Sequence, residues 1–437
     1  MNLGVHRIPE KVFLALAAGG GGTTAVELLR RAQYSKRLLL LRGVRNAGGP
    51  ETARAYDLLA RIQEDAPEAV EAVLRYPTVG EWTRRTLVVL SGKEDGSARP
   101  GEFAALAAGA AIKAGFRCEI EVPARSGAIV LPGLGRALVP GRASALVRSG
   151  PGGAEVVAGD ARTRLPRDVH RDAPGWEAIR RLTVEHRGAD GVFLLDEHDP
   201  DRMPGADWLP HRLGRSELEH WRSALDDAWR ILTRHHPSVA EDVAAFISVL
   251  TPLVSPVYRQ ASATPRHAFG SIGLSSPPDA RFLAVTLAHE VQHTKLTGLL
   301  DVVHLTEPDD GATYYAPWRD DPRPVAGLLQ GAYAHLGIAA FWRTQRHHET
   351  GAAALEADSE FARWRAATDL VIRTLAGTGR LTPEGEVFVG EMGRTVRAWL
   401  DEPVRDEALR RSRDTAGRHV VAWRRRYGAH PSLPGTA

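Results

Sequence analysis

Two histidines separated by a glutamate and two further residues are the most chemically specific feature of the sequence. The run TLAHEVQHTK contains His289, Glu290 and His293. Residues four apart lie about 40° apart around a helix, so both imidazoles face one side and can bind one metal ion. The motif therefore predicts a divalent metal site on a helix. The alternative is a pair of surface histidines on an amphipathic helix.

A working site of this kind needs a third protein ligand. His335 is the strongest candidate, because it lies on the apolar stripe of a helix predicted over 324–346. A histidine among apolar side chains needs a polar partner, which is either a metal ion or a backbone carbonyl. Gln330, on another face of the same helix, is the rival position. The other candidates within reach in the sequence are His304, Glu307, Asp309, Asp310, His347 and His348.

The loop between these two helices is rich in arginine, aromatic residues and proline. It reads TYYAPWRDDPRP over residues 313–324, and two prolines flank Arg323. Proline stiffens the backbone, and an arginine can hold a carboxylate through two parallel hydrogen bonds. Arg323 or Arg319 is therefore a candidate for holding a dicarboxylate near the metal. The competing interpretation is that both arginines form local salt bridges with Asp320 and Asp321.

The elements that must position these residues are mostly helical. Apolar residues recur at helical spacing before residue 110 and again after residue 216, whereas residues 115–200 contain short apolar runs cut by Gly and Pro. We expect a helix over 278–300 to carry the motif, capped by Ser276 or Asp279. The predicted fold class is α+β and predominantly α-helical, with a small antiparallel sheet. Its regions are a helical N-terminal region (1–110), a small β-rich region (111–212), a helical HExxH metal-binding catalytic region (213–430) and a frayed tail (431–437).

Composition narrows the class of protein. The 437 residues include 56 basic and 53 acidic ones, a net charge of +3 that gives no reason to expect a nucleic-acid partner. The single cysteine, Cys118, allows no intrachain disulfide. No run approaches the roughly 20 apolar residues that a membrane span needs. We therefore expect a cytoplasmic protein that binds neither nucleic acid nor membrane. The oligomeric state stays open.

Four segments together resemble a bacterial family, the 2-oxoglutarate HExxH-type peptide β-hydroxylases of ribosomal peptide pathways. The resemblance covers most of the chain and is strongest from about 190 to 345. Its most specific part is the Pro-Trp-Arg-Asp run of the loop. The segments that carry it are FGSIGLS (269–275), HEVQH (289–293), YAPWRDDPRP (315–324) and GLLQGAYAH (327–335).

The resemblance implies non-haem Fe(II), 2-oxoglutarate and O₂ as cofactor and co-substrates, and a ribosomally made precursor peptide as the partner. The product would be a β-hydroxylated side chain. By position, His289, His293 and His335 would be the metal ligands, and Arg323 or Arg319 would bind 2-oxoglutarate. Such an oxygenase needs no base, so Glu290 would orient a ligand histidine or contact the peptide.

Two other function classes stay open at this stage. A zinc-dependent HExxH peptidase would bind Zn(II) and use Glu290 as the base that activates water. A metal-free module would only bind a peptide or a partner protein. A further cluster, Asp196-Glu-His-Asp199, precedes a proline and is interpreted as a solvated turn rather than a ligand set.

Overall fold

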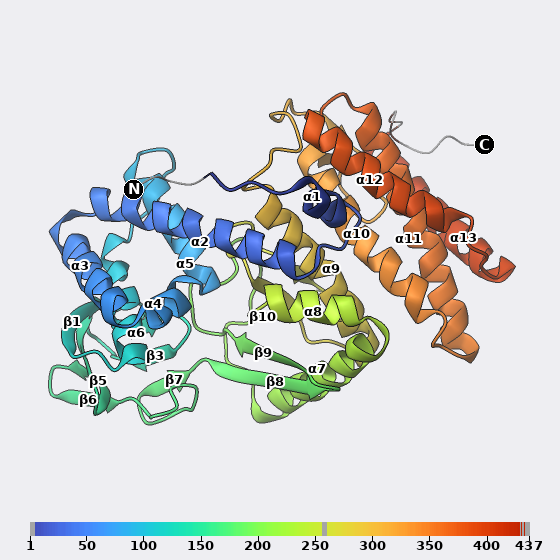
Figure 1. Ribbon diagram of the computed structural model, residues 1–437. Helices are drawn as coiled ribbons and strands as arrows, with labels where there is room; N and C mark the ends of the chain where they lie inside the picture. Colours follow the sequence, from blue (N-terminus) through green and yellow to red (C-terminus); the bar gives the residue numbers. More distant parts are fainter. Residues whose placement is uncertain (1–4, 256–259, 429, 431, 433–437) are drawn as a thin grey trace.

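The computed structural model describes residues 5–255, 260–428, 430 and 432. Of the predicted tail, 431–437, only Ser432 falls within them. The predicted α+β, predominantly helical fold is confirmed, with helices over most of the chain and several small sheets (Figure 1).

The N-terminal quarter of the described chain is helical, as predicted, and leads into a set of short strands. The helices are α1 (Glu10–Ala17), α2 (Gly22–Ala47), α3 (Gly49–Asp65), α4 (Pro67–Leu74), α5 (Pro77–Leu90) and α6 (Phe103–Ala114), with a 3₁₀ turn at Pro100–Glu102. The strands that follow are β1 (Cys118–Pro123), β2 (Ala128–Leu131), β3 (Gly135–Leu138), β4 (Ser144–Gly150), β5 (Gly153–Ala158), β6 (Ala161–Arg164), β7 (Trp176–Ala178), β8 (Arg180–His186) and β9 (Ala189–Leu195).

The C-terminal half is again mainly helical, with short strands between its helices. The helices are α7 (Arg215–His235), α8 (Pro237–Phe246), α9 (Ala280–Leu299), α10 (Val325–Gln345), α11 (Gly351–Gly377), α12 (Pro383–Leu400) and α13 (Asp406–Tyr427). The strands are β10 (Val249–Leu253), β11 (Ser262–Ala263), β12 (Ser271–Ser275), β13 (Thr313–Tyr314) and β14 (Arg323–Pro324).

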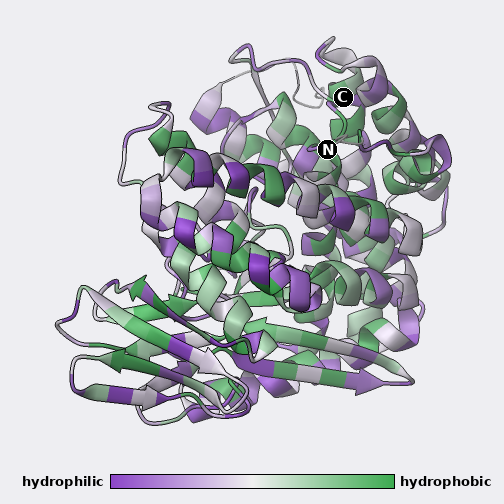
Figure 2. Cartoon of the chain, turned by 60° about the vertical axis from the view of Figure 1, so that its left-hand side comes forward, coloured by the Kyte–Doolittle hydropathy of each residue, from purple (hydrophilic) through white to green (hydrophobic). Residues whose placement is uncertain are grey.

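The strands form two antiparallel sheets, one mixed sheet and a small hairpin. The antiparallel sheets have the orders β1-β4-β5-β6 and β2-β3-β7, and the mixed sheet has the order β11-β12-β10-β9-β8. In the mixed sheet β10 runs parallel to both β9 and β12, a pairing that the sequence prediction did not include. Figure 2 shows the strands gathered along one side of the molecule, with the helices on the other.

The buried apolar residues form two cores. One joins α3–α6 to the two antiparallel sheets, and the other joins the mixed sheet to α1 and α7–α12. The long helix α2 contributes to both, with Ala25 and Leu29 in the second core and Leu41 and Val44 in the first. α2 therefore ties the N-terminal helices to the part of the chain that carries the HExxH motif.

Helix α10 is central to the second core. Within the described residues it is the one helix long and apolar enough to span a membrane by itself, and 72% of that apolar stretch is buried inside the protein. Helices α1 and α2 are long and apolar enough to span a membrane only when they are taken together, and a bend of 102° separates them. α10 thus has the burial of a core helix.

The cluster Asp196–Asp199 corrects one expectation. The sequence predicts a solvated turn here, but all four side chains are buried where β9 meets the N-terminal helices. The hydroxyls of Tyr76 and Thr78 donate to Asp196 and Asp199 at 2.6 and 2.5 Å. A turn-forming sequence predicts a reversal of the chain but not its burial, since burial depends on what packs over the turn.

Candidate metal centre

Helix α9 holds the HExxH motif and begins where the sequence predicted. The carboxylate of Asp279 accepts a hydrogen bond from the Phe282 amide at 2.7 Å, a standard N-cap that satisfies one of the free donors of the first turn. One turn apart on the helix, the rings of His289 and His293 have centroids separated by 4.8 Å. The helix is buried around most of its circumference, so it is not the amphipathic surface helix of the alternative interpretation.

Helix α10 brings His335 to the same place. A Cβ atom at Gly337 would lie 2.7 Å from the Gln292 Cγ and 2.8 Å from the Ala288 carbonyl oxygen, so only glycine permits this close crossing of α9 and α10. The crossing places the His335 ring centroid 5.1 Å from that of His289. Although the two histidines are 46 positions apart in the sequence, the packing of two helices makes them neighbours.

These separations suit one shared ion. Metal–nitrogen bonds of about 2.1 Å put the ring centroids of two imidazoles on one ion about 4.5–5.3 Å apart. The two measured separations fall in that interval. Within the described parts of the chain, however, no three His, Cys, Asp or Glu side chains already form a complete ligand set. The packing of α9 and α10 therefore brings the three histidines together, but binding one shared ion would require their rings to turn.

The hydrogen bonds of the rings leave nitrogens free for such an ion. The Nδ1 of His335 donates to the Gly331 carbonyl at 2.8 Å, which leaves its Nε2 as the ring nitrogen available to a metal ion. The Nδ1 of His293 donates to the Gln330 side-chain oxygen at 3.1 Å. The Nδ1 of His289 is buried and has no hydrogen-bond partner among the described residues. Partners of this type fix the tautomer and orientation of a metal-binding histidine.

Burial disfavours the charged form of two of these histidines, His289 and His335. Burial lowers the pKa of His289 to about 4, with a further lowering by His293 and an opposing effect of Glu290. Burial, followed by the neighbouring His289, holds the pKa of His335 well below its usual range. A metal ion binds the neutral form of imidazole, so neither side chain must first lose a proton.

Aromatic side chains form the wall around His335. The indole of Trp318, from the loop before α10, lies nearly parallel to the imidazole at a centroid separation of 4.1 Å. Trp364 of α11 approaches the same imidazole at 4.7 Å. Trp318 also packs on Gly331, where a Cβ atom would lie 2.5 Å from its Nε1. The wall leaves His289 partly accessible, with 17% of its side chain exposed.

Glu290 lies beside the histidines and is almost completely buried, with 1% of its side chain exposed. One carboxylate oxygen accepts a hydrogen bond from the Thr264 hydroxyl at 2.6 Å, and the other lies 3.8 Å from the Nε2 of His289. Thr264 therefore fixes this carboxylate next to a nitrogen that can bind metal. The position suits either role proposed for Glu290 from the sequence.

The two arginines of the loop share one carboxylate. Arg319 and Arg323 donate to the two oxygens of Asp321 at 3.0 and 2.9 Å. Both side chains are substantially exposed. This is the local salt bridge that the sequence offered as the competing interpretation, although with Asp321 alone and without Asp320. Co-substrate binding by either arginine would require its release from Asp321.

Arg363 on α11 is an arginine near the histidines that the sequence did not single out. Its guanidinium carbon lies 4.2 Å from the centroid of the Trp364 indole. Because Trp364 is 4.7 Å from His335, the guanidinium is at most about 9 Å from the His335 ring. Its charge also contributes, after burial and the other histidines, to the lowered pKa of His335. Arg363 has no motif around it, so only the packing of α11 on α10 reveals it.

The remaining candidates for the third ligand lie elsewhere. A separate cavity is lined by His304, Glu307, Asp309 and Asp310. His347 is exposed beyond the end of α10, and the His348 ring stacks on that of His235 at 3.8 Å. Gln330, the rival to His335, contacts His293 instead. Of these positions, His335 is the one placed against His289.

Comparison of the chain with known protein families and with curated proteins gives no significant match to either. A function for the histidine cluster must therefore be argued from its chemistry and from the motifs in the sequence.

Proposed function

We propose that the protein is a non-haem Fe(II)- and 2-oxoglutarate-dependent dioxygenase that β-hydroxylates a side chain of a ribosomally synthesised precursor peptide. The proposal combines the family resemblance of the sequence with one structural observation. That observation is the gathering of His289, His293 and His335 beside an aromatic wall, with the pKa values of His289 and His335 lowered by burial. Since the peptide is made on ribosomes, the proposed location is the cytoplasm.

Three histidines fit an oxygenase in ligand number and in charge. A six-coordinate iron held by three imidazoles keeps three positions for co-substrates, as in the facial triads of non-haem iron enzymes. When bound, Fe(II) would supply the oxidising chemistry that converts a C–H bond and O₂ to C–OH, with 2-oxoglutarate giving the balancing electrons as it becomes succinate and CO₂. Because the imidazoles are neutral, the dicarboxylate is the natural source of compensating negative charge.

The side chains around the histidines have distinct proposed roles. Gln330 and the Gly331 carbonyl orient two of the rings through their Nδ1 atoms. Trp318 and Trp364 keep water away from His335. An arginine holds the far carboxylate of 2-oxoglutarate. A five-carbon diacid spans about 5 Å between its carboxyl carbons, and Arg363, at most about 9 Å from the His335 ring, is a further candidate for this role. Arg323 and Arg319 remain the candidates from the sequence.

A zinc peptidase is the second candidate, and the position of Glu290 favours it. The Glu290 carboxylate lies 3.8 Å from the His289 Nε2, where a peptidase would place the base that activates water. Its hydrogen bond from Thr264 and its deep burial favour a positioning role instead. A metal-free peptide-binding module is the third candidate, consistent with the incomplete ligand geometry of the described residues.

Anaerobic reconstitution with Fe(II), followed by addition of 2-oxoglutarate, distinguishes the three. A visible metal-to-ligand charge-transfer band that is lost in His293→Ala is expected for the oxygenase. Tight zinc binding and cleavage of a generic peptide, with activity lost in Glu290→Gln and no such band, would establish the peptidase. Failure to bind either metal would establish the metal-free module.

A further inference from the structure

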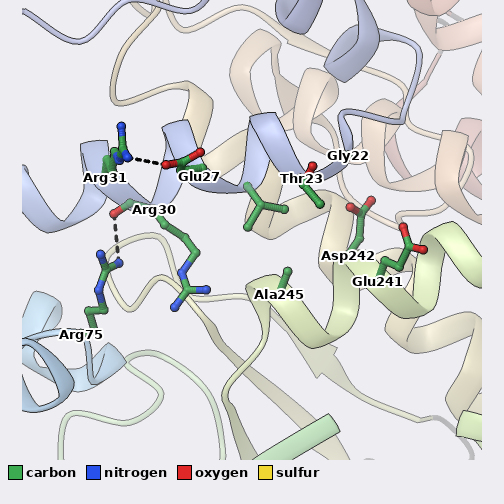
Figure 3. Close-up of a pocket in the computed structure, with 10 residues that line it drawn as sticks. Gly22, Thr23, Glu27, Arg30, Arg31, Arg75, Glu241, Asp242 and Ala245 are labelled. Atoms are coloured by element: carbon green, nitrogen blue, oxygen red, sulfur yellow. Dashed lines mark hydrogen bonds and ion pairs between the residues drawn. The ribbon is translucent and has the colours of Figure 1, made fainter. Parts of the chain in front are cut away.

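A groove follows one face of α2, and Lys295 of α9 reaches its edge, where it donates to Asp242 at 2.8 Å. Its first part is a cavity of about 350 Å³ between α2 and α8 (Figure 3). Its second part, of about 260 Å³, continues along α2 toward β12. The two cavities share Arg30, Arg75 and Ala245, so they adjoin along α2 and together make up the groove.

The length of the groove suits an extended chain better than a compact ligand. Its α2 lining extends from Gly22 in the first cavity to Arg37 in the second. Fifteen helical residues correspond to about 22 Å at 1.5 Å per residue. An extended peptide covers about 3.3–3.6 Å per residue. The groove therefore has room for roughly six residues of extended peptide.

Among the described residues, the first cavity has one arginine without a carboxylate partner, Arg30, because Arg31 pairs with Glu27 and Arg75 pairs with Glu71. Figure 3 shows the Arg30 side chain directed into the first cavity. Arg75 also donates to the Arg30 backbone carbonyl at 3.3 Å, which holds the Arg75 side chain against α2. Burial and the charge of Arg75 both lower the pKa of Arg30.

A third arginine adds to this charge from the floor of the second cavity. Arg37 is 4% exposed and donates to three backbone carbonyls, those of Leu74, Tyr76 and Phe269, at 2.8, 3.2 and 3.1 Å. Carbonyl dipoles satisfy its hydrogen bonds but do not cancel its charge. Placing like charges in a half-buried groove is unfavourable unless an anion binds among them.

The ends of the groove differ from its middle. The half-buried Tyr34 and the outer edges of the buried Phe246 and Phe269 line the second cavity and make its wall apolar. Glu241 and Asp242 lie at the far end of the first cavity (Figure 3). The Lys295 ammonium donates to Asp242 at 2.8 Å, which neutralises that carboxylate. Glu241 is exposed and has no such partner in the described chain.

We propose that this groove binds an extended acidic peptide segment, with a carboxylate side chain between Arg30 and Arg75 and an apolar side chain among Tyr34, Phe246 and Phe269. The identification of the ligand as a peptide rests on the proposed function. The binding itself requires neither metal nor turnover, so the groove and the hydroxylase can fail independently. A substrate would then be recognised at a second place as well as at the histidines.

The test uses the full-length apoprotein and fluorescein-labelled hexapeptides of alternating leucine and glutamate, with binding followed by fluorescence anisotropy at low salt. We expect the acidic hexapeptide to bind at least tenfold more tightly than versions with glutamine or lysine in place of glutamate. Arg30→Glu should weaken binding at least tenfold. Arg42→Glu is the matched control, because Arg42 is exposed on the same helix and lines neither cavity. This control should change binding less than twofold.

Three outcomes would overturn the proposal. The first is equal binding of the acidic and glutamine hexapeptides. The second is an equal loss in the Arg30 and Arg42 variants, which would indicate only a general effect of net charge. The third is that free glutamate binds as tightly as the hexapeptide, which would make this a site for small anions. If Arg30→Glu does not fold, Arg30→Gln removes the charge alone and is expected to give the same direction of change.

Discussion

The indole of Trp318 lies on the imidazole of His335, with ring centroids 4.1 Å apart and planes 13° apart. The two residues belong to different elements, a proline-rich loop and the buried helix α10. Their contact is possible because residue 331, one turn before His335, is glycine and leaves space for the indole. The same glycine offers its carbonyl to the His335 Nδ1. Loop and helix therefore position one candidate ligand together.

Gly331→Ala is expected to displace Trp318 and weaken metal binding, because the new Cβ would lie 2.5 Å from the indole Nε1. Metal titration followed by tryptophan fluorescence measures both effects. Gly327→Ala is the matched control, since a Cβ one turn earlier meets the Arg323 Nε at 3.5 Å, an ordinary contact. Equal metal affinity in both variants would show that the indole does not support the site.

His289→Ala, His293→Ala and His335→Ala are each expected to abolish stoichiometric binding of Fe(II) or Zn(II), because two imidazoles are too few for a stable site. Isothermal titration with metal is the measurement. His347→Ala is the control, since this side chain is exposed beyond the end of α10. Retention of metal by His335→Ala alone would mean that another group completes the site.

Gln330→Ala removes the acceptor for the His293 Nδ1–H. Loss of such a partner typically costs about 10–100-fold in metal affinity, which sets the expected size of the effect. Gln330→Glu retains an acceptor oxygen and should keep most of the affinity. Competition with a chelator of known strength gives the affinities. An unchanged value for Gln330→Ala would show that the ring is held by packing alone.

The arginine that holds 2-oxoglutarate can be identified by titrating the charge-transfer band in three alanine variants. If Arg323 holds the far carboxylate, Arg323→Ala should raise the 2-oxoglutarate concentration needed for half-saturation while the metal stays bound. If Arg319 holds this carboxylate instead, Arg319→Ala should raise the 2-oxoglutarate concentration needed for half-saturation. Arg363→Ala should do so if the arginine near Trp364 has this role. We expect at least a tenfold increase in one of the three, and no increase in any would exclude all of them.

The buried carboxylate of Asp199 makes stability depend on pH. Burial and the charges of Asp196 and Asp201 raise the pKa of Asp199 to about 8, so the folded state retains a proton that the unfolded state releases near pH 4. The folded protein therefore loses stability as pH rises between about 4 and 8, by up to about 1.4 kcal/mol per pH unit.

Asp199→Asn stays neutral and should escape this loss. Its free energy of unfolding, measured by urea denaturation, is expected to increase relative to that of the wild type as pH rises from 5 to 8. Asp190→Asn, at an exposed position, is the control and should follow the wild-type curve. Parallel curves for Asp199→Asn and the wild type would mean that Asp199 is ionised throughout this range.

The sequence by itself determined the local features of this protein. Periodicity predicted α9 and α10 to within two residues, and Asp279 was one of the two predicted caps. The apolar stripe predicted that His335 faces inward, and it is 6% exposed. These features depend on neighbours three or four residues away, so the amino-acid order is sufficient to predict them.

Only the tertiary structure decided which distant residues meet. The crossing at Gly337 places His335 beside His289, and the packing of α11 brings Arg363 near the same ring. The parallel strands β10 and β12 and the burial of Asp196–Asp199 were likewise not predicted. Such contacts depend on shape complementarity between elements far apart in the chain, for which local periodicity has no signal. The three histidines could therefore be identified as candidates from the sequence, but only helix packing brought them together.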